Sequence, residues 1–151
     1  MQTTLRGPEL LEFADIHAVE VPAIPLVRHV AEKLHAYTRA YGRAGRPSSR
    51  VKDLVDLALI ASEADLDAAQ LRQQLDATFN SRGTHDLPTE LPKPPHDWTV
   101  PYGKLAREVG IPERIEEGHS GAAAMLDAVL SGQMADGAWD ARAGAWRAAL
   151  N

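Results

Sequence analysis

The residues of this chain whose types and spacing suit chemistry lie at the start of an apolar segment, "RPSSRVKDLVDLALI", at positions 46–60. At about 100° per residue, Lys52, Asp53 and Asp56 fall in one sector of the predicted helix, and apolar side chains cover most of the remaining circumference. A helix that is apolar nearly all round is buried nearly all round, so this polar sector must face a cleft, a ligand or compensating charges. Two carboxylates one turn apart beside a lysine suit general-base catalysis or phosphate binding.

A purely structural interpretation of these charges is also open. The helix dipole favours aspartate in a first turn. Either aspartate could simply pair with Arg50 or Arg46, which precede it in the same segment.

The preceding helical segment carries a lysine that points to the same kind of site. Lys33 lies at the border of its apolar face, one turn after His29. Lys33 could instead pack its methylene groups against the apolar face and extend its ammonium into solvent. His29 could be an ordinary solvated or hydrogen-bonded histidine. His29 and His35 do not form a metal-ligand pair, because residues six apart lie on different faces of a helix.

The charge of the chain is unevenly distributed. The formal net charge is -5, which argues against coating of nucleic acid by the whole surface. From Arg28 to Lys52, however, there are seven basic residues and a single acid, Glu32, so this segment carries +6 and the rest carries -11. A basic patch on an acidic body suggests a localised anionic ligand such as phosphate, although a solvated helix face with an Arg-rich loop would have the same charge.

The elements that must position these residues are predicted to be mainly helices. Periodic apolar positions predict helices over 26–41, 50–62, about 66–82, 102–109 and 120–130. Residues 42–49 connect the first two, and Asp65 or Asp67 is the expected N-cap of the third. The four prolines of 87–98 predict a packed extended connector or a flexible linker. A short β element is expected near the N-terminus, and the two tryptophans of the tail are expected to anchor it onto the core.

Several functional classes lack any signal in the sequence. There is no cysteine, no signal-peptide h-region and no apolar run long enough for a membrane span, so we expect a cytoplasmic protein without disulfides. Phosphate-binding loops, nucleophile elbows, zinc motifs and dinucleotide fingerprints are also missing.

The paired segment "HVAEKLHAYTRAYGRAGRPSSRVKDLVDLALI" resembles the AbiEii/AbiGii nucleotidyltransferase toxin family of bacterial type IV toxin–antitoxin and abortive-infection systems. The "AEKLHA" and "SSRVKDLVDL" helices are similar to the last two of the four motifs of that family. The following helix, the Thr-Phe and Arg, and the proline-rich segment that ends in Trp have a similar layout. The resemblance covers about residues 10–146.

The resemblance implies a bilobed fold, with an α/β nucleotidyltransferase lobe followed by a helical lobe. Residues 1–25 would end a truncated α/β lobe, and 26–151 would form the helical lobe. Within that lobe, 26–82 would carry the motifs, 83–98 would be the Pro-rich connector and 99–151 would contain the C-terminal helices.

The resemblance also implies roles for individual residues. Lys33 would be catalytic and hold nucleotide phosphates, and Asp53 would be an essential carboxylate. Asp56, Lys52, Arg50 and His29 would be supporting residues. Arg39, Arg43 and Arg46 would contact the phosphates of nucleotide or RNA. The complete enzyme would use Mg²⁺ and an NTP, neither of which this chain would bind alone. It would act on RNA such as tRNA and would have an antitoxin partner.

The sequence departs from the family in one respect. The chain contains no Gly-Ser dipeptide, and its one Asp-x-Asp, Asp65 to Asp67, follows the second predicted helix rather than lying on an apolar strand. The resemblance therefore covers the C-terminal portion of such a toxin, with no metal ligands in this chain, and predicts little transfer without the N-terminal lobe. The alternatives are a non-catalytic helical module that binds RNA, nucleotide or an antitoxin partner, and a helical interaction protein whose charges are all structural.

Overall fold

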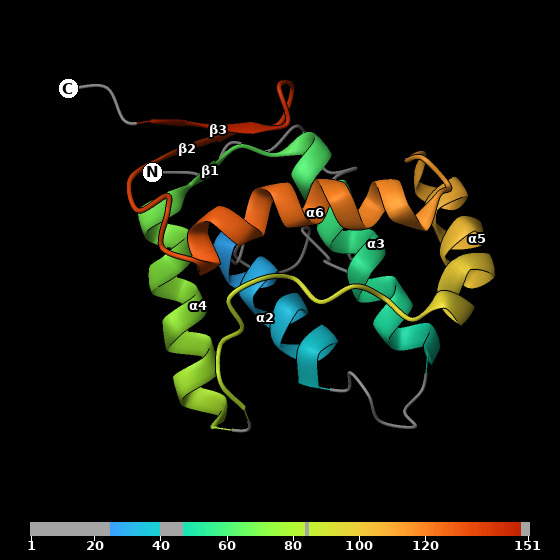
Figure 1. Ribbon diagram of the computed structural model, residues 1–151, viewed down its shortest axis with the longest axis horizontal. Coiled ribbons are helices and arrows are strands. Elements are labelled where there is room, and N and C mark those ends of the chain that lie inside the picture. The colour runs from blue at the N-terminus through green and yellow to red at the C-terminus, as the bar shows by residue number, and fades with distance from the viewer. Residues whose placement is uncertain (1–24, 40–46, 84, 149–151) are drawn as a thin grey trace, which may run out of the picture.

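A computed structural model describes residues 25–39, 47–83 and 85–148, which form a mainly helical structure (Figure 1). The helices are α2 (Leu26–Arg39), α3 (Pro47–Glu63), α4 (Ala68–Arg82), the 3₁₀ turn η1 (His96–Trp98), α5 (Thr99–Val109) and α6 (Ile115–Leu130). The strands β1 (Leu66–Asp67), β2 (Gly137–Asp140) and β3 (Ala145–Ala148) form an antiparallel sheet in the order β1-β2-β3. The predicted mainly-α fold class is confirmed, whereas the β element expected near the N-terminus lies outside the described residues.

Helix α3 is the central element of the core. Every residue from 53 to 61 is buried, and the helix packs against α2, α5 and α6. No glycine or proline interrupts this run, and its leucines, valines and alanines supply apolar surface around nearly the whole helix. The predicted burial of this segment is therefore confirmed, and Asp53 and Asp56 are buried with it.

Helix α4 begins and ends where its sequence signals predict. The Asp67 side chain accepts a hydrogen bond from the Gln70 amide at 2.9 Å and caps the helix, as expected. Gly83 ends it in the left-handed conformation, with φ of 61°. Helix α4 packs along α2, and Arg82 near its end forms an ion pair with Glu32.

The proline-rich connector is packed and extended, the first of the two predicted forms. Leu91 is buried, and its amide donates to Asp127 Oδ1 at 2.8 Å. The Tyr37 hydroxyl donates to the Pro92 carbonyl at 2.7 Å. At the end of the connector, the Trp98 ring meets Tyr37 edge to face, so the connector is fixed to α2 and α6.

The C-terminal segment contains two predicted helices and one element that was not predicted. Helices were predicted over 102–109 and 120–130, where the structure has α5 and α6, whereas 137–148 forms a β-hairpin. Gly144, with φ of 64°, forms the turn, and its amide donates to the Asp140 carbonyl at 2.8 Å. Trp139 and Trp146 lie opposite each other in the register and stack edge to face, so their spacing reflects strand pairing. The expected anchoring is confirmed, because Trp139 is buried and its Nε1 donates to the Ala61 carbonyl at 2.8 Å.

The C-terminal ends of three helices receive hydrogen bonds from distant side chains. The last four carbonyls of a helix have no partner within the helix. Arg50 donates to Ala36 of α2, Trp139 donates to Ala61 of α3, and Arg72 donates to both Val129 and Leu130 of α6. These contacts fix the ends of α2, α3 and α6 relative to the rest of the fold. In the part of the chain that the structure describes, no helix has the length and apolar character that crossing a membrane requires.

Candidate functional site

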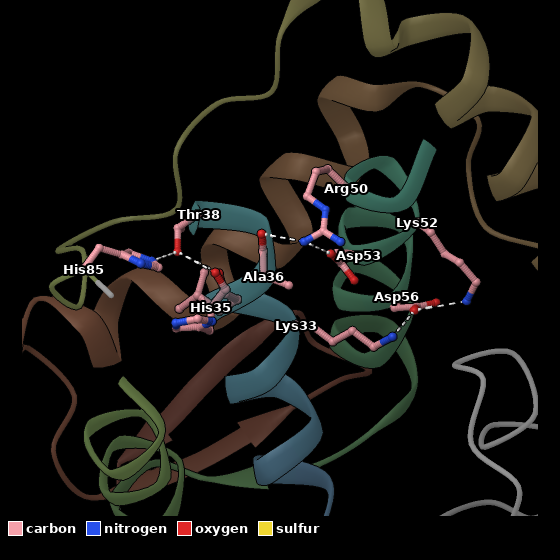
Figure 2. A network of polar contacts seen from close by, with 10 residues as sticks. Lys33, His35, Ala36, Thr38, Arg50, Lys52, Asp53, Asp56 and His85 are labelled. Carbon is pink, nitrogen blue, oxygen red and sulfur yellow. Dashed lines mark hydrogen bonds and ion pairs between the residues drawn. The ribbon is translucent and has the colours of Figure 1, made fainter. Parts of the chain in front are cut away.

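The charged residues predicted from the sequence meet where α2 packs against α3. Lys33 extends from α2 toward Asp56 of α3, and Lys52 projects from α3 and reaches the same carboxylate with its ammonium (Figure 2). Asp53 lies one turn before Asp56, beside Arg50. The two helices pack through buried side chains such as Val30 and Leu34 of α2. The apolar periodicity of both segments therefore determines which polar residues face one another.

The closest contact of the site joins Lys33 to Asp56. Lys33 Nζ donates to Asp56 Oδ2 at 2.6 Å, and Lys52 Nζ lies 3.4 Å from the same oxygen. The Asp56 side chain is 1% exposed and that of Lys33 is 16% exposed. Burial raises the pKa of Asp56, and the charge and hydrogen bond of Lys33 oppose this increase. Asp56 Oδ2, on a side chain that is almost inaccessible to solvent, therefore contacts the ammonium groups of both Lys33 and Lys52.

Asp53 is less well compensated than Asp56. Arg50 Nη1 lies 3.3 Å from Asp53 Oδ2, and the same Nη1 donates to the Ala36 carbonyl at 2.7 Å. The Oδ2 atom of Asp53 is buried and makes no hydrogen bond among the described residues. Burial raises the pKa of Asp53 to about 6, and the nearby charges of Arg50, then of Lys33, oppose this rise. Asp53 is therefore a buried carboxyl group that titrates close to neutral pH.

His29 lies one turn before Lys33 on α2 and is half-buried. Its Nε2 atom is buried without a hydrogen-bond partner among the described residues. Burial, and then the charge of Lys33, lower the pKa of His29. The imidazole is therefore neutral at pH 7.

The predicted site residues divide into three groups. Lys33, Asp53, Asp56, Lys52 and Arg50 come together at the α2–α3 contact (Figure 2). Arg39 is exposed at the end of α2. Arg43 and Arg46 lie outside the described residues. The alternative that the aspartates serve only as ion-pair partners of nearby arginines is confirmed for one pair, Arg50 with Asp53.

Sequence reasoning missed the second contact of Arg50 and a cluster of rings beside the site. His35 stacks near His85 and Phe79, and Thr38 Oγ1 lies 2.7 Å from His85 Nε2. Burial and the neighbouring His85 lower the pKa of His35. His85 lies on the connector, 50 residues after His35 in the sequence, and no local pattern predicts their contact.

The fold and the site together define a helical module with a buried lysine–aspartate cluster. The protein-family model described as "Nucleotidyl transferase AbiEii toxin, Type IV TA system" matches residues 4–148. The chain therefore belongs to this family, as the resemblance of its α2 and α3 motifs indicated. Membership implies a nucleotidyltransferase toxin of a type IV toxin–antitoxin system, with an antitoxin partner. No curated protein and no solved structure gives a significant match to the chain.

Proposed function

We propose that the α2–α3 contact is part of a nucleotidyl-transfer site that moves a nucleotide from an NTP to RNA, with the 3′ end of tRNA as the acceptor. The observation that supports this most directly is the buried Lys33–Asp56 pair beside Asp53, whose Oδ2 makes no hydrogen bond to any residue that the structure describes. A lysine and a carboxylate with a raised pKa, held together in a dry position, are the groups that phosphoryl transfer requires for charge neutralisation and proton transfer.

In the proposed reaction, the 3′-hydroxyl oxygen of the RNA attacks the α-phosphorus of the NTP. A new P–O bond forms, the bond to pyrophosphate breaks, and the proton of the hydroxyl passes to Asp53. A base with a pKa of about 6 is well matched to proton transfer near neutral pH. Lys33 balances the negative charge of the phosphates, for which its ammonium must turn from Asp56 toward the nucleotide.

The remaining residues of the cluster position these two groups. Asp56 holds Lys33 close to Asp53 in the absence of substrate, and Lys52 shares the charge of Asp56. Arg50 connects Asp53 to the end of α2 and so fixes the separation of the two helices. Arg39, with Arg43 and Arg46, would contact phosphates of the nucleotide or of the RNA backbone.

Nucleotidyl transfer of this class uses Mg²⁺, and the described residues do not fit a complete site for this ion. Both buried aspartates lie beside cations, and no group of three or more His, Asp or Glu side chains suitable for a metal occurs in 25–39, 47–83 and 85–148. We propose that the metal-holding carboxylates belong to a Gly-Ser turn and paired-aspartate strand supplied by a polypeptide segment outside these 151 residues. The reaction would take place in the cytoplasm, where NTPs and tRNA are available.

A second function, a module that binds RNA, nucleotide or the antitoxin without catalysis, is favoured by a different observation. Lys33, Lys52 and Arg50 are already paired with Asp53 and Asp56. A site whose positive and negative charges already neutralise one another can act only to stabilise the fold, or can bind an anion without catalysing its transfer.

The proposal is tested by incubating the chain with labelled NTPs, Mg²⁺ and total tRNA, with and without a polypeptide that carries the Gly-Ser and paired-aspartate element. We expect label in tRNA when this element is present, and a loss of at least about 100-fold in Lys33→Ala and Asp53→Asn. Arg107→Ala is the matched control, because Arg107 forms an exposed ion pair with Glu113 away from the site. Transfer that survives both site substitutions would refute the site, and no transfer under either condition would favour the binding module.

A further inference from the structure

Asp56 contacts two cations, although one cation is enough to neutralise a carboxylate. Lys33 of α2 donates to Asp56 Oδ2 at 2.6 Å, and Lys52 of α3 lies 3.4 Å from the same oxygen. The two ammonium groups approach the carboxylate from different sides (Figure 2). The contact with Lys33 is therefore a full charge-assisted hydrogen bond, and the contact with Lys52 is a longer and weaker one.

The second cation matters because Asp56 is almost inaccessible to solvent. Its side chain is 1% exposed, so water cannot take the place of a lysine that moves away. A buried carboxylate that loses its counter-ion strongly destabilises the structure around it. Lys33 can therefore leave Asp56 readily only if another cation compensates the carboxylate.

Lys52 has the position that this compensation requires. It lies four residues before Asp56 on the same helix, so their contact does not depend on where the Lys33 side chain points. Its ammonium needs to move only about 0.6 Å closer to reach the usual length of a charge-assisted hydrogen bond. The Lys52 side chain is 34% exposed, which leaves room for this movement.

We propose that Lys52 is the replacement counter-ion of Asp56, a positioning residue that allows Lys33 to turn from Asp56 to the phosphates of a nucleotide. This inference rests on the proposed transfer site, in which Lys33 makes that turn. Without nucleotide, Asp56 holds Lys33 closely and Lys52 loosely. With nucleotide, Lys33 lies on the phosphates and Lys52 alone neutralises Asp56. The nucleotide thus selects one of two arrangements of the same ion pairs.

The exchange is tested first without nucleotide, by urea denaturation of the full chain. Lys33→Met removes the closer cation and so imitates its departure. We expect Lys52→Met to raise the unfolding equilibrium constant about twofold in the wild type. In the Lys33→Met background it should raise this constant at least about tenfold, because Asp56 then loses both contacting lysines. Lys104→Met, the same substitution at an exposed position of α5, should have equal effects in the two backgrounds.

A further variant keeps this test decisive if Lys33→Met/Lys52→Met does not fold. Addition of Asp56→Leu should then restore folding, because it removes the uncompensated carboxylate. Equal effects of Lys52→Met in the wild type and in Lys33→Met would overturn the exchange. A failure of Asp56→Leu to restore folding would overturn it as well.

ATP binding then tests whether the transfer site uses the exchange. It is measured by isothermal titration calorimetry with the full chain and the polypeptide that carries the Gly-Ser and paired-aspartate element. We expect Lys52→Met to weaken binding at least about tenfold in the wild type, but less than about twofold in Asp56→Asn, which has no carboxylate to neutralise. An equal loss in both backgrounds would show that Lys52 contacts the phosphates itself, and would overturn its role as a replacement. No binding of ATP by the wild type would refute the proposed transfer site, whereas the urea result would still decide the exchange.

Discussion

The Lys33 ammonium lies 2.6 Å from Asp56, although the resemblance to the family gave the essential role to Asp53. Lys33 and Asp56 come from different helices and are 23 residues apart in the sequence, so their contact fixes α2 relative to α3. Asp53, one turn earlier, pairs with Arg50 of its own helix instead. The two aspartates therefore have different environments, and substitutions should separate their roles.

The first prediction concerns the stability of the Lys33–Asp56 pair. Lys33→Met should lower the free energy of unfolding by about 3 kcal/mol, because removing one partner leaves a buried carboxylate poorly compensated. The double variant Lys33→Met/Asp56→Leu should recover most of this loss, because it removes both charges. Urea denaturation of the wild type and both variants measures the effect. Arg107→Met, which breaks an exposed pair, should leave the urea midpoint close to that of the wild type. A loss of stability as large as that of Lys33→Met would contradict the assignment.

The second prediction is a pH dependence caused by Asp53. Its pKa is about 6 in the folded chain and 3.8 in the reference state. The folded state therefore binds the extra proton between these values, so this contribution is fully present below pH 3.8 and is lost as the pH rises through 6. It amounts to about 3 kcal/mol.

Asp53→Asn removes this titration and keeps the shape of the side chain. The difference in unfolding free energy between this variant and the wild type should change in favour of the variant from pH 4 to pH 7.5. Chemical denaturation at each pH measures this difference, which also cancels the contributions of other titrating groups such as His29 and His35. A difference that stays constant across the range would show that Asp53 does not have a raised pKa.

The third prediction compares two glycines three residues apart in α6. Gly118→Ala should destabilise the fold by about 1–3 kcal/mol, because the new methyl group would overlap the Tyr102 hydroxyl. Gly121→Ala should be neutral or stabilising by up to about 1 kcal/mol, because its methyl group enters open space and alanine favours the helix. Thermal unfolding of the two variants side by side tests this. Equal effects at both positions would be inconsistent with the packing of Tyr102 on Gly118.

The fourth prediction concerns the bond from Trp139 to the end of α3. Trp139→Phe should cost about 2–3 kcal/mol, because the Ala61 carbonyl loses its donor and the smaller ring leaves a void. Trp146→Phe is the control, since it removes a similar N–H bond to Met125 from a half-buried position. It should cost less than half as much in urea denaturation. The reverse order would contradict the deeper anchoring of Trp139.

Local periodicity predicted most of the described fold and the composition of the site. The apolar positions of 50–62 predicted that α3 is buried with its charges in one sector, and Asp67 was identified as a possible cap. The hairpin was not predicted, because "WDARAGAWRAAL" contains good helix formers, and only pairing across the Gly144 turn explains its tryptophans. The choice of Asp56 over Asp53 as the partner of Lys33 depends on how α2 and α3 pack, and no local pattern contains that information.

A nucleotide site at the contact of α2 and α3 is tested most directly by isothermal titration calorimetry of ATP at low salt, with the full chain combined with the polypeptide that carries the Gly-Ser and paired-aspartate element. We expect Lys33→Met and the double variant Lys33→Met/Asp56→Leu to bind ATP at least about tenfold more weakly than the wild type, because each loses a charge-assisted hydrogen bond to the phosphates. Arg107→Met should bind within about twofold of the wild type, because it lies outside the site. Wild-type affinity in both Lys33 variants, or no binding of ATP by the wild type, would contradict a nucleotide site at the contact of α2 and α3.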